Sequence, residues 1–298
     1  MLPAMQTLSR RAFVRRSAGA AAAWALAPAL APLLAAPESR RFRIGACDWS
    51  LGQMASLEAF AVAREIGLDG VQVSLGTEKN NMHLRQPAVQ QAYRDKARET
   101  GVAVASLALG ELNNIPFKSD PRTIAWVGDA VDAAAALGVR VILLAFFYKG
   151  DLRDDPAGVA EVVRRLKTLA PRAEKARVVL GLESWLSAAG HLDIIDRVGS
   201  RAVQVYYDVC NSNDRGYDIY REIRDLGRRG LICELHAKEN GALLGQGKVD
   251  FPKVRAALDD IGYAGWIQIE GALPAGAALV PSYQANLKYL RGIFPREA

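Results

Sequence analysis

Four residues that can bind a metal ion each follow an apolar run in the second half of the chain. They are Glu183 in VVLGLESW, Asp208 in VQVYYDVCN, His236 in LICELHAKE and Glu270 in GWIQIEG, at successive separations of 25, 28 and 34 residues. Three carboxylates and one imidazole suit a hard or borderline divalent cation: Mn²⁺, Co²⁺ or Mg²⁺ first, with Zn²⁺ or Fe²⁺ also compatible. A cation that binds the carbonyl and hydroxyl oxygens of a substrate makes the neighbouring C–H acidic, and a nearby carboxylate can then take the proton.

These four residues can meet only if the strands that carry them end on the same side of one sheet. From Pro37 the sequence alternates eight strand-like runs with helix-sized segments, which is typical of βαβ units and a parallel sheet. We expect strands at residues 42–49, 70–75, 102–109, 139–147, 178–183, 202–207, 231–236 and 266–270. We expect helices at residues 57–66, 86–100, 123–137, 156–176, 190–198, 218–227, 252–261 and 282–293.

Eight such repeats favour a closed barrel over an open, doubly wound sheet. No Gly-x-Gly-x-x-Gly follows the first strand, which weakens the dinucleotide-binding alternative. We therefore expect one α/β domain, a single (β/α)8 TIM barrel, over residues 37–298. In such a barrel the C-terminal ends of the strands converge on the mouth that holds the active site. The four residues would then form one metal site at that mouth.

Other polar and aromatic residues should lie at the same mouth because they also follow predicted strands. Lys238, two residues after His236, could stabilise an enolate or act as an acid, or it could pair with Glu239 or another carboxylate. Glu111 could be an additional base or could stabilise its loop. The residues expected to contact substrate are Glu111, Asn113, Asn211, Trp49 and Trp185. The aromatic side chains at the mouth, which also include Phe146, Phe147 and Tyr148, could stack on a sugar or pack under the loops.

The remaining histidines and the cysteines are not expected in the metal site. His83 and His191 do not follow predicted strands, so we expect them on the surface or in loops. The three cysteines are odd in number and irregularly spaced, which predicts buried free thiols rather than a disulfide framework. Cys210, two residues after Asp208, is left open as a soft ligand.

The first 36 residues are predicted to be an export signal. Ser9-Arg10-Arg11-Ala12-Phe13-Val14-Arg15 resembles the twin-arginine motif of bacteria, an alanine-rich apolar stretch follows at 18–34, and Ala35 and Ala36 could form a cleavage site. Pro28 and Pro32 in a weakly hydrophobic stretch disfavour the alternative, a transmembrane anchor. We therefore expect a periplasmic or otherwise exported protein that uses the twin-arginine export machinery and keeps no stable membrane anchor.

The net charge of +6 does not indicate a nucleic acid partner. The 38 basic residues include four arginines in the first 36 residues, which contain no acid, so the rest of the chain sets 34 basic against 32 acidic residues. A balance of about +2 provides no electrostatic case for nucleic acid or an anionic membrane.

From roughly Phe42 to the C-terminus, the chain resembles the xylose isomerase-like barrels of the sugar isomerase/epimerase superfamily. The resemblance rests on Glu, Asp, His and Glu after strands five to eight, on His236-Ala237-Lys238-Glu239, and on the tract GQGKVDFPKVRAALDDIGYAGWIQIE. It implies that Glu183, Asp208, His236 and Glu270 are the metal ligands, and that Glu183 and Glu270 exchange protons with the substrate. Ketose 3-epimerases of this superfamily have a histidine where this chain has Asn211, and an arginine where it has Ala242, so the substrate is expected to differ from theirs.

The leading hypothesis is an exported, divalent-metal-dependent sugar isomerase or epimerase that abstracts a proton next to the carbonyl of a sugar or polyol derivative. One alternative is a metal-dependent lyase or hydratase acting on keto-sugars or 3-keto-glycosides, because elimination begins with the same proton abstraction. A second is a carbohydrate-binding barrel without turnover. An enzyme like endonuclease IV is the least favoured, because that chemistry uses several zinc ions and many histidines, and this chain has three. The sequence leaves open whether the protein forms a homo-oligomer.

Overall fold

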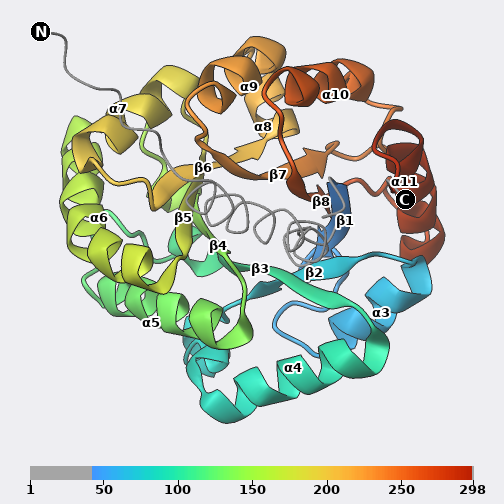
Figure 1. Cartoon of the computed structure of the whole chain (residues 1–298), viewed down its shortest axis with the longest axis horizontal. Coiled ribbons are helices and arrows are strands. Elements are labelled where there is room, and N and C mark those ends of the chain that lie inside the picture. The colour runs from blue at the N-terminus through green and yellow to red at the C-terminus, as the bar shows by residue number, and fades with distance from the viewer. Residues whose placement is uncertain (1–41, 297–298) are drawn as a thin grey trace, which may run out of the picture. The chain divides into compact units, whose positions relative to one another are not determined.

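A computed structural model describes residues 42–296, in which eight parallel strands close into a barrel surrounded by helices (Figure 1). The strands follow one another in chain order from β1 to β8, and β8 pairs with β1 to close the barrel. The predicted α/β class and (β/α)8 TIM barrel are therefore confirmed. The predicted signal at residues 1–36 lies outside the described residues, as does the start of the predicted domain at residue 37.

The strands are buried along most of their length, as their apolar sequences predict. They are β1 (Phe42–Cys47), β2 (Gly70–Ser74), β3 (Ala103–Leu109), β4 (Val141–Phe146), β5 (Val179–Ser184), β6 (Val203–Asp208), β7 (Ile232–Lys238) and β8 (Gly265–Glu270). β4, with the sequence VILLAF, is buried throughout because the barrel interior covers one face and the helices cover the other. β7 runs two residues beyond its predicted end because Lys238 pairs with Glu270 of β8.

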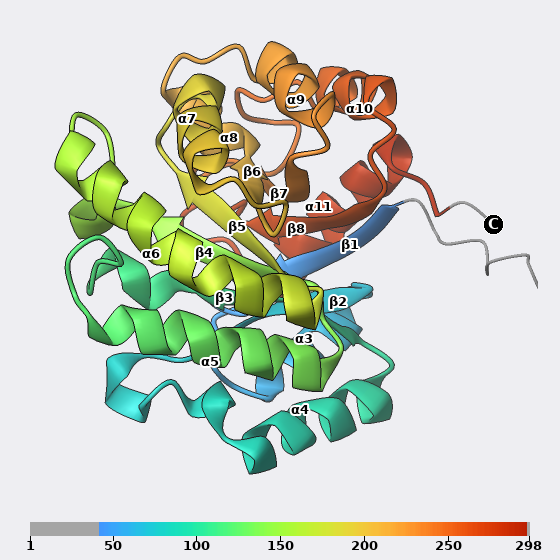
Figure 2. The same ribbon diagram turned by 60° about the vertical axis from the view of Figure 1, so that its left-hand side comes forward.

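The outer layer consists of long helices that pack around the barrel (Figure 2). They are α3 (Glu58–Ile66), α4 (Pro87–Thr100), α5 (Arg122–Leu137), α6 (Pro156–Ala176), α7 (Ala188–Val198), α9 (Ile219–Gly227), α10 (Phe251–Asp260) and α11 (Leu279–Ile293). Each covers the barrel with an apolar face; α5, for example, buries Val127, Ala130 and Val131. α7 begins two residues before its predicted start because the Ser187 hydroxyl accepts a hydrogen bond from the Gly190 N–H and caps the helix.

Short helical segments at the C-terminal ends of the strands are absent from the sequence expectation. They are η1 (Glu78–Asn80), η2 (His83–Arg85), η3 (Gly110–Asn113), η4 (Tyr148–Gly150) and α8 (Val209–Asp214). None is long enough to show a helical period, so hydrophobic periodicity cannot reveal them. They form part of the rim of the barrel mouth and therefore bear directly on the site. Within residues 42–296, no helix combines the length and apolar character needed to cross a membrane.

Candidate metal centre

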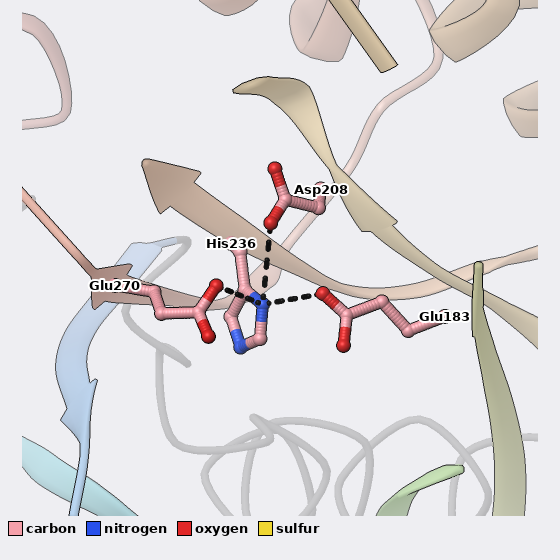
Figure 3. Close-up of side chains that lie close together, drawn as sticks. All are labelled: Glu183, Asp208, His236 and Glu270. Atoms are coloured by element: carbon pink, nitrogen blue, oxygen red, sulfur yellow. Dashed lines mark hydrogen bonds and ion pairs between the residues drawn. The ribbon is translucent and has the colours of Figure 1, made fainter. Parts of the chain in front are cut away.

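Glu183, Asp208, His236 and Glu270 meet inside the C-terminal end of the barrel (Figure 3). One potential ligand atom from each residue lies within 4.8 Å of those of the others. Nδ1 of His236 is 2.9 Å from Glu183 Oε1, 3.3 Å from Glu270 Oε2 and 3.8 Å from Asp208 Oδ2. The structure thus brings together all four residues that the sequence predicts as metal ligands. Cys210, which the sequence left open as a soft ligand, is not part of this group.

The register of the sheet explains why these side chains converge. Asp208 lies opposite His236 across the β6–β7 pair, and Lys238 lies opposite Glu270 across the β7–β8 pair. Side chains alternate between the two faces of a strand, so His236 and Lys238 point into the barrel from β7. The imidazole is fully buried and packs against the ring of Tyr206, with the ring centroids 4.6 Å apart.

Asp208 divides its two oxygens between a helix and the cluster. Oδ1 accepts hydrogen bonds from the backbone N–H groups of Cys210 and Asn211 at 2.9 and 2.8 Å, and so caps the N-terminus of α8. Oδ2 faces Nδ1 of His236. The two hydrogen bonds to Oδ1 fix the Asp208 carboxylate, so that Oδ2 points into the cluster, where it could bind a metal ion.

The donors in this cluster fit a divalent cation. Asp208 Oδ2 and Glu270 Oε2 are buried and have no hydrogen-bond partner among the described residues. Their nearest cation is Lys238 Nζ, which lies at ion-pair distances of 3.4 and 2.9 Å. Buried polar atoms are rarely left without a partner, so two such oxygens beside an imidazole nitrogen indicate room for a metal ion.

Ionisation in the cluster reflects burial and close opposite charges. Burial raises the pKa of Glu183, although the His236 ring opposes this. Burial would also raise the pKa of Asp208, but Lys238 and His236 outweigh it and lower that pKa. For Lys238, burial lowers the pKa, yet the charges of Asp208, Glu270 and Glu183 dominate and raise it. Three carboxylates therefore face one ammonium group and one imidazole. With the imidazole neutral, two negative charges remain, and a divalent cation would balance them.

A polar layer beneath the cluster sets the orientation of His236. Nε2 of His236 lies 2.9 Å from Gln72 Oε1, which can only accept, so Nε2 carries a proton. Nδ1 is turned towards the carboxylates, and its lone pair would be available to a cation bound between them. The Gln72 amide donates to Ser106 Oγ at 3.1 Å, and Ser106 donates to Glu234 Oε1 at 2.9 Å. Gln72 was not among the residues predicted for the site, although the sequence offers a signal for it, a single amide side chain within the apolar strand GVQVS.

A cavity of about 580 Å³ opens above the cluster, and its lining includes every residue predicted to contact substrate. Glu183, Glu270 and Lys238 also line it, whereas Asp208 and His236 do not. The two glutamates are therefore the ligand candidates that a bound molecule could touch. The predicted substrate-contact residues that line the cavity are Trp49, Glu111, Asn113, Trp185 and Asn211.

Several of these residues also have structural partners. Trp49 Nε1 donates to Glu270 Oε1 at 2.9 Å and so orients that carboxylate. Asn113 Oδ1 accepts from the Phe147 N–H at 2.9 Å. Glu111 accepts from the Glu78 N–H, which is the loop-stabilising alternative. Lys238 pairs with carboxylates of the cluster rather than with Glu239, whose oxygens accept from backbone N–H groups at 248 and 249.

Two expectations about other residues need correction or refinement. His191 was expected on the surface or in a loop, but it is buried in α7, where Nε2 lies 3.0 Å from Ser184 Oγ. His83 is half-buried in η2. The cysteines are free, as predicted; Cys47 and Cys210 are buried and Cys233 is half-buried. Cys47 lies 3.3 Å from Nε2 of His236, on the side of the ring away from the cluster.

Comparison with known proteins identifies the family. The family described as xylose isomerase-like TIM barrel matches residues 60–293, which is most of the chain, so the chain belongs to this family. It is 27% identical over 177 residues to 2-epi-5-epi-valiolone 7-phosphate 2-epimerase of an Actinoplanes species. It is also 27% identical over 237 residues to L-ribulose-5-phosphate 3-epimerase of Salmonella paratyphi C.

The extent of these similarities differs. The match to the 2-epimerase covers 59% of this chain and 65% of that protein, slightly under two thirds, and the match to the 3-epimerase covers 72% and 81%. Among solved structures, D-psicose 3-epimerase with D-tagatose from Clostridium cellulolyticum superposes with a TM-score of 0.72, over 85% of this chain and 99% of that one. At 19% sequence identity, this likeness concerns the fold.

Proposed function

We propose that this member of the xylose isomerase-like TIM barrel family is a divalent-metal-dependent isomerase or epimerase. It moves a proton next to the carbonyl of a sugar or polyol derivative. One observation carries the proposal: Glu183 and Glu270 reach the cavity from β5 and β8, while Asp208 and His236 complete the cluster beneath them. The two relatives named as epimerases support it.

The four residues divide the chemistry between them. Glu183, Asp208, His236 and Glu270 would hold the cation, which when bound would orient substrate oxygens and polarise the carbonyl. The carboxylates of Glu183 and Glu270 lie on opposite sides of the imidazole in Figure 3, so each can face a different side of a bound sugar. In an epimerisation, one accepts a proton from carbon and the other delivers a proton to the opposite face. Lys238 Nζ would donate a hydrogen bond to the enolate oxygen of the substrate.

The test is solvent-deuterium exchange into the carbon beside the carbonyl of keto sugars, followed by NMR with Mn²⁺, Co²⁺ or Mg²⁺ added. We expect exchange that depends on the metal and is lost in Glu183→Gln. Glu222→Gln is the matched control, because Glu222 is a half-buried carboxylate outside the cavity that bonds to the Ala188 N–H and the Tyr207 hydroxyl. If no divalent metal binds and Glu183→Gln behaves as the wild type does, the proposal is wrong.

A metal-dependent lyase is the second candidate. Asn211 lines the cavity but Ala242 does not, so the imidazole and guanidinium that the resemblance to ketose 3-epimerases would supply are missing from this cavity. Elimination begins with the same proton abstraction but expels a β-substituent instead of returning the proton. The NMR products separate the two reactions, because an epimer keeps every substituent and an elimination product contains a new C=C bond.

The predicted export signal belongs to this proposal because it decides where the enzyme works. We propose that residues 1–36 direct the chain through the twin-arginine machinery to the periplasm or beyond. A fusion of these residues to a reporter that is active only after export tests this directly. The double substitution Arg10→Lys and Arg11→Lys should abolish export; export that persists with two lysines would contradict a twin-arginine route.

A further inference from the structure

Two large apolar side chains, Met54 and Tyr148, are exposed at the mouth of the cavity. Among the described residues, Met54 and Tyr148 are the two large hydrophobic residues that are mostly exposed, at 54% and 75%. Both line the cavity above the metal cluster. Exposed apolar groups gathered at a binding cleft commonly mark a surface that a ligand covers.

The backbone around both residues is held by hydrogen-bonded turns. The Ala55 N–H donates to the buried carboxylate of Asp48 at 3.0 Å, and the Gln53 N–H donates to the Asp48 carbonyl at 2.9 Å, which fixes the backbone on either side of Met54. Tyr148 has a φ of 50°, a left-handed conformation that costs a bulky residue on the order of 1 kcal/mol. The strained backbone places its ring against Trp185, with centroids 5.5 Å apart.

The wall next to Tyr148 is a fixed aromatic surface. The Trp185 ring also contacts Phe147, at a centroid distance of 5.2 Å. The guanidinium groups of Arg153 and Arg215 lie 5.0 and 4.6 Å from the centroid of the same ring. These contacts pack Trp185 on several sides, so a flat apolar group at the mouth would meet mainly the exposed ring of Tyr148, which rests against Trp185 as a preformed surface.

The size and charge of the cavity indicate what the platform would bind. A hexose fills at most roughly 360 Å³, at about 30 Å³ of liquid volume for each water-sized group, so a cavity of about 580 Å³ leaves room for a second group. The cationic residues among the described lining are Lys79 and Lys238, and Lys238 is engaged by Asp208 and Glu270. Arg153 and Arg215 lie behind the lining, against the Trp185 ring, and Arg153 is paired with Asp151. Within the lining, a phosphate would therefore meet a single available lysine together with the carboxylate of Glu111.

We infer that the substrate is a keto sugar that carries an apolar, ring-shaped substituent, such as an aromatic glycoside, with the sugar over Glu183 and Glu270 and the substituent against Tyr148 and Trp185. This inference rests on the proposed function for the chemistry at the sugar. The platform itself can be tested separately by binding.

The test compares methyl and phenyl glycosides of the same hexose with a ring ketone, using the full chain loaded with metal. By calorimetry, the phenyl glycoside should bind about tenfold more tightly than the methyl glycoside, because an aromatic contact adds to the buried apolar area. Tyr148→Ala should lower that preference to about twofold or less, whereas Tyr148→Phe should retain it. Because Tyr148 is largely exposed, neither substitution should change the thermal midpoint of unfolding by more than a few degrees.

The outcomes separate the two proposals. Equal affinity for the two glycosides, or equal losses for both in Tyr148→Ala, overturns the platform, whatever the catalytic result. A phenyl preference that Tyr148→Ala removes supports the platform, even if neither glycoside exchanges deuterium. Lack of exchange in free keto sugars and in both glycosides counts against the proposed function instead.

Discussion

Gln72 should control metal affinity although it does not touch the metal. Its Oε1 accepts the Nε2 proton of His236 at 2.9 Å, and its own amide is oriented by Ser106. Gln72→Leu removes the acceptor and leaves the Nε2–H with only the Cys47 sulfur at 3.3 Å. The imidazole is then free to turn or to take the tautomer with the proton on Nδ1, where it would face Glu183, Glu270 and the bound ion.

The expected loss follows from the position of this hydrogen bond. Partners that orient a ligating histidine typically contribute about 10–100-fold to metal affinity. We therefore expect Gln72→Leu to weaken binding of Mn²⁺ or Co²⁺ by that factor, which corresponds to about 1.4–2.7 kcal/mol. Isothermal titration at fixed pH measures it directly. The stabilisation of the fold by saturating metal should fall by the same free energy.

A second buried glutamine provides the control. Gln90 is also buried, in α4, and its amide donates to the carbonyl groups of Leu84 and Arg85. Gln90→Leu should destabilise the fold by about 1–3 kcal/mol without weakening metal binding. Ser106→Ala should weaken metal binding in the same direction as Gln72→Leu but by less, about threefold. If Gln72→Leu lowers stability like the control yet binds metal within twofold of wild type, the role assigned to Gln72 is wrong.

Three further predictions concern groups around the cluster. Lys238→Met should raise metal affinity roughly tenfold in titrations, because the cation that competes for Asp208 and Glu270 is removed; weaker binding would contradict this. Trp49→Phe should lower kcat for deuterium exchange about tenfold and change KM less, since it removes the N–H donated to Glu270. Burial lowers the pKa of His191 to about 4, so the unfolded chain binds more protons than the folded one below about pH 6.5, and stability is lost as the pH falls from there. Between pH 7.5 and pH 5.0, urea unfolding should show wild type losing about 2 kcal/mol of stability relative to His191→Gln, and the same pH dependence in both proteins would refute this assignment.

The barrel and its cluster could be predicted because each depends on local patterns. Every strand is covered on both faces, so each strand appears in the sequence as a continuous apolar run between two helical segments. In a parallel barrel the end of each run must face the mouth, so the position of Glu183 after LGL already places it there. The same logic located Asp208, His236 and Glu270 without knowledge of any contact between them.

The partners of these residues could not be predicted because they depend on contacts between distant parts of the chain. The bond from Gln72 to His236 joins residues 164 positions apart, and the pairing of Lys238 with Glu270 depends on the β7–β8 register. His191 was misplaced for a related reason. Its helix puts it on the buried face with Ile194 and Ile195, and the hydroxyl that accommodates it there, Ser184, comes from β5.

The polar layer in the barrel shows that this sequence favours the site over maximal stability. Barrel interiors are commonly filled by branched apolar side chains, but here Gln72, Ser106, Glu234 and Gln268 are all fully buried beneath the cluster. The layer is incompletely satisfied, since Glu234 Oε2 and Gln268 Oε1 have no hydrogen-bond partner among the described residues. Such atoms cost stability, and well-packed apolar replacements would recover it. The layer nevertheless contains Gln72, whose Oε1 accepts the Nε2 proton of His236 and so fixes its tautomer. A more stable apolar layer would lack this acceptor, and His236 would no longer be held in the orientation that metal binding requires.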